Sequence, residues 1–197
     1  GDALMAEEDF DPIEIDRRAH DYVKAGFYRR DEIIQALIDE FCDEVDEGRL
    51  RAMAVHAVDL AIRDQVRAQE FWPVLTDCDR LDQAFENLED GGIVARQNFT
   101  CCQNCGHAEI GDEVDGAGER GLPVHGYTFY HQQDTERAAA DSELYLAYGA
   151  VGHDDTLKVA RAIVVAIESC GLRTEWNGSV GQRIRVALNW QRRFPDD

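Results

Sequence analysis

Apolar residues recur every three or four positions through residues 11–92, which is the spacing of one buried face on an α-helix. The clearest stripe runs through residues 33–45, where aspartate and glutamate fill the opposite, water-facing side. Residues that favour helix starts and ends divide the stretch: Asp11-Pro12 and Thr76 as starts, and Gly91-Gly92 as an end. The pattern predicts about four helices in this half of the chain.

The period of the apolar positions changes to two after residue 92, as in strands with one buried face. Strands are predicted at residues 93–99, 127–131, 144–150, 172–176 and 184–190, and helices at 134–140 and 155–170. Asn177-Gly178 favours a tight antiparallel hairpin between the last two strands. The acidic, glycine-rich residues 111–121 are predicted to form a connection without regular structure.

These elements predict an α+β fold, in which a helical N-terminal half packs with a mixed sheet of about five strands and two to three helices. The change of period divides the chain into an acidic helical region, residues 1–92, and an α/β region, residues 93–197. The second region holds a cysteine cluster and the C-terminal hairpin. The alternative is one integrated domain, because the helical stripes could equally pack on the sheet.

The protein carries 40 acidic and 20 basic side chains, a formal net charge of −20 at pH 7. Such a charge repels the phosphates of nucleic acids and of anionic membranes, so neither is predicted as a partner. Residues 1–92 hold 25 acidic and 10 basic side chains, whereas residues 93–197 hold 15 and 10. An acidic helical surface could therefore meet a basic protein. Coding bias with a surface adapted to solubility, or a salt-rich cytoplasm, explains the charge as well.

The apolar runs bear on the location of the protein. None reaches the roughly 18–20 apolar residues that a membrane-spanning helix needs. Residues 1–9 are acidic and lack the basic stretch and apolar core of a signal peptide. We therefore expect a soluble, cytoplasmic protein.

Three of the six cysteines crowd into residues 101–107, which read Cys-Cys-Gln-Asn-Cys-Gly-His. Cys102 and Cys105 have the Cys-x-x-Cys spacing of a zinc knuckle. Thiolate and imidazole ligands suit Zn²⁺, which favours four such groups in a tetrahedron. The predicted ligands are Cys101, Cys102, Cys105, His107 and His131, with His125 as the other nearby choice for a fourth position.

Two other interpretations of this cluster stay open. A strand that runs into Cys-x-x-Cys and then into a helix start is also the layout of thioredoxin-like redox sites, although the usual Gly-Pro between the cysteines is missing. The cysteines could also simply pack at the end of a buried strand. His131 is open in the same way: with Asp134 or Glu136 it could be a general base, whereas Asp134 could merely cap a helix.

Several further runs carry a family resemblance: Asp77–Leu81, Gly92–Glu109, Gly126–Thr135, Leu144–Gly149 and Trp176–Ser179. Together they resemble an uncharacterised bacterial protein family, a domain of unknown function with a Cys-Cys-x-x-Cys-Gly-His segment. The resemblance covers most of residues 75–193, with a looser helical match before them. It implies one recurrent unit, and it implies no activity, cofactor or catalytic residue.

The sequence leaves open whether the protein is an enzyme. It contains no serine nucleophile elbow, Walker loop or dinucleotide fingerprint. This favours a non-catalytic protein-binding or regulatory module with an acidic surface. The alternative is a metal- or thiol-dependent enzyme built on the Cys101–His107 cluster. A homodimer formed through the sheet edge or an apolar helical stripe is a further prediction.

Overall fold

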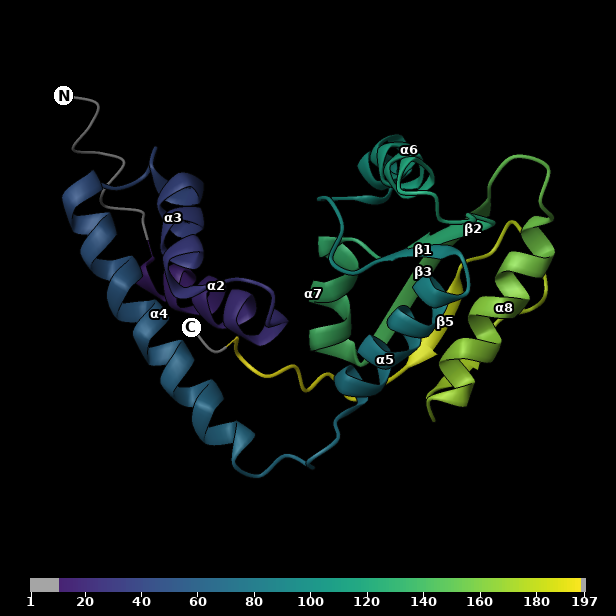
Figure 1. Ribbon diagram of the computed structural model, residues 1–197. Coiled ribbons are helices and arrows are strands. Elements are labelled where there is room, and N and C mark those ends of the chain that lie inside the picture. The colour runs from purple at the N-terminus through teal and green to yellow at the C-terminus, as the bar shows by residue number, and fades with distance from the viewer. Residues whose placement is uncertain (1–10, 196–197) are drawn as a thin grey trace. The chain divides into compact units, whose positions relative to one another are not determined.

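The computed structural model describes residues 11–195, so the acidic residues 1–9 lie outside the described part of the chain (Figure 1). The predicted α+β class is confirmed: the described residues form seven helices and a mixed five-stranded sheet. They divide into two compact units, one of residues 11–73 with 191–195 and one of Val74–Trp190. The division into regions 1–92 and 93–197, and the independence of either, stays a prediction.

The first unit is built from three helices, α2 (Pro12–Ala25), α3 (Arg30–Phe41) and α4 (Glu47–Gln69). Asp11 begins α2 as predicted, because its carboxylate accepts a hydrogen bond from the backbone N–H of Ile13 at 3.0 Å. The apolar stripes of the three helices meet in one buried cluster. Residues 191–195 return to this unit, where Gln65 donates to the backbone carbonyl of Arg192 at 3.0 Å.

The second unit contains the sheet, with strand order β1-β2-β3-β5-β4. The strands are β1 (Ile93–Arg96), β2 (Gly126–Phe129), β3 (Glu143–Ala150), β4 (Arg173–Glu175) and β5 (Ile184–Ala187). β1 and β2 are parallel, and every other pair is antiparallel, which confirms the predicted β4–β5 pairing. Most strands are shorter than their apolar patterns predict, because pairing stops before the alternation does.

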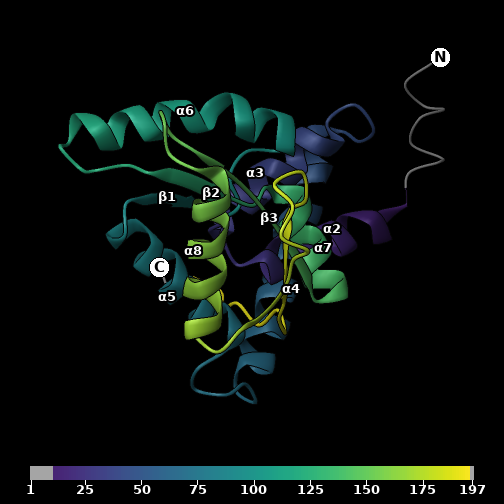
Figure 2. The same cartoon turned by 90° about the vertical axis from the view of Figure 1, so that its right-hand side faces the viewer.

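Helices cover both faces of this sheet (Figures 1 and 2). They are α5 (Asp77–Asp90), α6 (Gln103–Glu119), α7 (Gln132–Asp141) and α8 (Thr156–Ser169). α8 lies on the face of Gly126, where a Cβ would meet the Val159 side chain at 2.7 Å. α6 lies on the opposite face, where Phe129 packs with Ile110 in a buried cluster. The asparagine at position 189 donates its backbone N–H to Asp77 at 2.9 Å, so the two ends of this unit are joined.

The helix α6 corrects the prediction for residues 111–121. Most of that acidic, glycine-rich stretch is helical rather than irregular. Four glycines lower its intrinsic helix propensity by roughly 1 kcal/mol each, which is why the local pattern fails to predict a helix. Gly106, Ile110 and Ala117 nevertheless form a buried stripe at helical spacing. Packing against the sheet therefore overrides the propensity.

The start of α7 also differs from the prediction. His131, and not Asp134, is the residue that caps this helix. The imidazole Nδ1 accepts from the backbone N–H of Asp134 at 3.2 Å, and the carboxylate of Asp134 accepts from the backbone N–H of His131 at 3.3 Å. This reciprocal capping box places the histidine at the C-terminal end of β2.

Candidate functional site

A short loop carries the cysteines from the end of β1 to the start of α6. Asn98 and Thr100 adopt left-handed backbone conformations, with φ of +50° and +61°. For a β-branched threonine this conformation is an outlier that the surroundings must hold in place. The carbonyl of Thr100 accepts from the backbone N–H of Gln132 at 3.0 Å, and the N–H of Phe99 donates to the carbonyl of Tyr130 at 2.8 Å. The loop is thereby fixed to the residues that follow β2.

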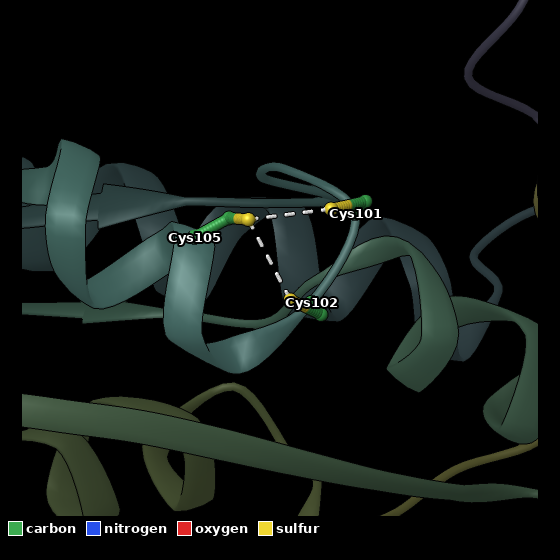
Figure 3. A group of neighbouring side chains, drawn as sticks. All are labelled: Cys101, Cys102 and Cys105. Carbon is green, nitrogen blue, oxygen red and sulfur yellow. Dashed lines mark hydrogen bonds between the residues drawn. The ribbon is translucent and has the colours of Figure 1, made fainter.

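The three thiols of this loop converge at the N-terminus of α6 (Figure 3). Cys102 is the N-cap residue, Cys101 precedes it, and Cys105 lies in the first turn. The Cys105 sulfur is 3.4 Å from the Cys101 sulfur and 3.6 Å from the Cys102 sulfur. All three sulfurs lie within 4.8 Å of one another, and across residues 11–195 no other group of three or more His, Cys, Asp or Glu has this spacing.

The surroundings shift the pKa values of Cys102 and Cys105 in opposite directions. The backbone N–H of Cys105 and then the Cys105 thiol favour the thiolate of Cys102 and lower its pKa. Hydrogen bonding to Cys101 and Cys102, followed by repulsion from their charge, raises the pKa of Cys105 to about 12. Of these two thiols, Cys102 therefore loses its proton more readily than Cys105.

Two of the three sulfur–sulfur separations are close to those that a tetrahedral metal ion requires. With Zn–S bonds of roughly 2.3 Å, two ligands of a tetrahedron lie roughly 3.8 Å apart. The observed separations of 3.4 and 3.6 Å are within a few tenths of an ångström of that edge. A disulfide requires roughly 2.05 Å, and all six cysteines are free. The group could therefore hold a metal ion through three sulfurs, with one coordination position left for another ligand.

The structure does not bring the two predicted histidine ligands into this group. His107 follows Cys105 by two positions, which turns it to another side of the helix. Its ring packs on Phe129, with centroids 5.1 Å apart, and its Nδ1 lies 3.4 Å from the Tyr127 hydroxyl. Burial, and secondarily the charge of Arg183, lowers the pKa of His107.

Both ring nitrogens of His131 are already engaged at the start of α7. Nδ1 accepts from the backbone of Asp134, and Nε2 lies 3.0 Å from the carboxylate of the same residue. Burial is the largest cause that lowers the pKa of His131. His125, the other nearby choice, pairs with Asp154 at 3.4 Å. Ligation by any histidine thus stays a prediction.

Arg183 is the residue of this region that the sequence interpretation missed. Its Nη1 donates to both carboxylate oxygens of Asp134, at 3.0 and 2.9 Å, and so joins the buried pair of Asp134 and His131. The sequence pairs His131 with Asp134 because they are close in the chain. Arg183 lies 49 positions beyond Asp134, and no local pattern signals the contact.

The chain is thus an α+β protein with a thiol cluster at the start of a sheet-covering helix. A family model described as Domain of unknown function (DUF6891) matches residues 8–194, and the chain belongs to that family. No curated protein and no solved structure matches it. The family confirms the resemblance seen in the sequence, whereas the bacterial origin expected from it stays a prediction.

Across residues 11–195, no helix combines the length and the apolar character needed to cross a bilayer.

Proposed function

We propose that the protein binds zinc through the thiolates of Cys101, Cys102 and Cys105. The observation that carries the proposal is the spacing of the three sulfurs, two of whose separations approach a tetrahedral edge. Three protein ligands with an open fourth position are typical of zinc sites that bind water or a substrate, where the ion acts as a Lewis acid. The proposal therefore favours the metal-dependent enzyme over the non-catalytic binding or regulatory module.

The proposed ligands differ in how readily they lose a proton. Backbone N–H groups at the helix start stabilise the thiolate of Cys102 and lower its pKa. Cys105 has to lose its proton, since only a thiolate is a good metal ligand. Metal binding is therefore expected to release protons and to weaken as the pH falls.

Elemental analysis of protein purified without added metal, beside a thiol titration, tests the proposal. We expect one zinc per chain, and a loss of at least tenfold in zinc affinity in Cys105→Ser, because that sulfur contacts both others. Cys42→Ser is the matched control, since Cys42 is exposed and lies outside the cluster. Full zinc retention in Cys101→Ser, Cys102→Ser and Cys105→Ser alike would rule the proposal out.

The predicted histidine ligands are tested in the same way. His107→Gln removes an imidazole that caps no helix, whereas His131→Asn keeps a side chain that can cap α7. Zinc loss in one of them assigns the fourth position to that histidine. Unchanged zinc in both leaves three thiolates as the protein ligands.

A dithiol redox site is the second candidate, favoured by the position of Cys102 at the N-cap of α6. The Cys102 thiolate would attack a substrate disulfide and release one substrate thiol. The Cys105 thiol, losing its proton, would then attack the mixed disulfide and release the second. The products are a Cys102–Cys105 disulfide and two substrate thiols. Two measurements test this candidate. Iodoacetamide should alkylate the metal-free protein fastest at Cys102. The Cys105→Ser variant, incubated with a substrate disulfide, should trap the mixed disulfide.

A basic protein partner is a third candidate, favoured by one acidic row. The helix α6 contains no lysine or arginine, and its exposed face carries four carboxylates, those of Glu109, Asp112, Asp115 and Glu119. Capture of a partner at low salt should be lost when the row is neutralised to Gln and Asn. The matched control neutralises four exposed carboxylates of the first unit, Asp39, Asp43, Glu44 and Glu47. The homodimer stays a prediction that light scattering tests.

A further inference from the structure

A small polar pocket opens beside the first turns of α6, on the side away from Cys105. Its volume is about 170 Å³, and the part of its wall that comes from α6 consists of Gln103 and His107. The opposite wall is the segment Val180–Arg183, which leads into β5. Ala147 and Tyr148 of β3 form the remainder. No cysteine lines it, so the pocket is separate from the proposed metal ligands.

Arg183, which lines this pocket, has an unused hydrogen-bonding edge. Its Nη1 is held by both oxygens of the buried Asp134, which fixes the guanidinium in place. Within residues 11–195, its Nε and Nη2 have no hydrogen-bond partner, and a quarter of the side chain is exposed. A guanidinium fixed at one nitrogen, with donors free on another edge, is prepared for an anion that presents two oxygens.

The wall opposite α6 is held in a defined shape. The hydroxyl of Tyr148 donates to the carbonyl of Gln182 at 2.6 Å and lies 3.1 Å from the carbonyl of Ser179. The indole N–H of Trp176 donates to the same Ser179 carbonyl at 3.1 Å. The side chain of Asn177 accepts from the backbone N–H of Ser179 at 2.9 Å. A ligand therefore meets a wall that is already ordered, which lowers the entropic cost of binding.

We propose that this pocket binds a small oxyanion group, such as a phosphate or a carboxylate, on the free edge of Arg183. The amide of Gln103 and the imidazole of His107 supply further polar contacts from α6. The volume accommodates a group of a few non-hydrogen atoms. The site adds an anion-binding function to the protein, independent of the metal proposed for the cysteines.

Titration with inorganic phosphate and, separately, with acetate tests the site and distinguishes the two sources of the oxyanion. The anion replaces chloride at constant ionic strength, and the ring signals of His107 are followed by NMR. We expect saturable shifts with a Kd on the order of 1 mM for at least one of the two anions. Arg183→Lys keeps the charge but removes the two-donor edge, and should weaken binding about tenfold.

Two controls decide where a bound anion sits. Arg173→Lys makes the same substitution on an exposed residue of β4 outside the pocket, and should leave the affinity unchanged. The variant with serine at all three cluster cysteines should also bind normally. Loss of binding in that serine variant, with retention in Arg183→Lys, would move the anion to the metal site and overturn the inference. Equal affinity in both arginine variants and the parent protein, or no saturation by either anion, overturns it too.

Discussion

The helices α5 and α6 lie before and after the same strand, β1, and they are stabilised by different means. α5 has a capping box at Thr76 and five buried side chains at helical spacing, so its own sequence specifies it. α6 has four glycines, a cysteine at its N-cap and three buried residues. Its stability depends on close contact with the sheet. The helix that bears the cysteines is thus the one that the rest of the fold must hold.

Loss of the ring on which α6 packs should have the largest effect. Phe129 is fully buried and contacts both Phe99 of the cysteine loop and His107 of α6. Phe129→Ala should lower the free energy of unfolding by about 3–5 kcal/mol. Hydrogen exchange should then quicken in α6 more than in α5. Phe85→Ala, on α5, is the control; equal quickening of both helices by both variants would contradict the comparison.

A methyl group at Gly106 should be the next most disruptive change. A Cβ there would lie 2.3 Å from the buried Phe129 ring, so the ring or the helix must shift. Gly106→Ala is expected to cost about 1–3 kcal/mol in thermal or denaturant unfolding. The same substitution at Gly111, where a Cβ would meet nothing within 4 Å, should stabilise α6 by about 0.5–1 kcal/mol. If both substitutions stabilise, close packing is not what limits α6.

Loss of the cap of α5 should have a smaller and more local effect. Thr76 is buried, and its hydroxyl accepts from the backbone N–H of Asp79 at 3.2 Å. Thr76→Ala should cost about 1 kcal/mol in denaturant unfolding. Zinc content and the reactivity of Cys102 should not change, because the cap serves α5 alone. Thr76→Ser, which keeps the hydroxyl, is the control, and altered thiol chemistry in Thr76→Ala would link the two helices.

Mild acid should have the smallest effect, and it should destabilise α6 more than α5. Burial lowers the pKa of His107 on α6, so the unfolded chain binds a proton there more readily than the folded one. The stability from the neutral imidazole is present above the unfolded pKa of roughly 6.5 and is lost as the pH falls through the lower, folded value. α5 contains no histidine. Hydrogen exchange at pH 7 and pH 5 should show α6 loosening first, and His107→Gln should remove the difference.

These two helices also show how far the sequence could predict the fold. The start of α5 at Thr76, its buried stripe and its end near Gly91 are local features, and the prediction from them is confirmed. The glycines of α6 disfavour the prediction of a helix from the sequence. Only the nearby Phe129 ring explains why Gly106 has to lack a side chain. A contact between residues far apart in the chain decides this element, and apolar periodicity does not record such contacts.

The candidate site divides in the same way. Cys101, Cys102 and Cys105 are neighbours in sequence, so their grouping could be predicted from spacing, and the structure gathers them. The sequence favours the histidines as ligands because they are near in the chain, but helix geometry and capping engage their rings elsewhere. Arg183 comes from a distant strand start, so only the sheet brings it to Asp134.

The path of the chain through the two units has a consequence for the order of synthesis. Residues 191–195 join the first unit, where Phe194 donates its backbone N–H to Gln69 at 2.6 Å and Arg193 donates to the carbonyl of Pro73 at 2.8 Å. Val74–Trp190 is therefore an insertion within the helical unit, and its ends are held together at Asp77 and Asn189. A ribosome has to complete the inserted sheet before the helical unit receives its last contacts. The unit that is begun first is the one that is finished last.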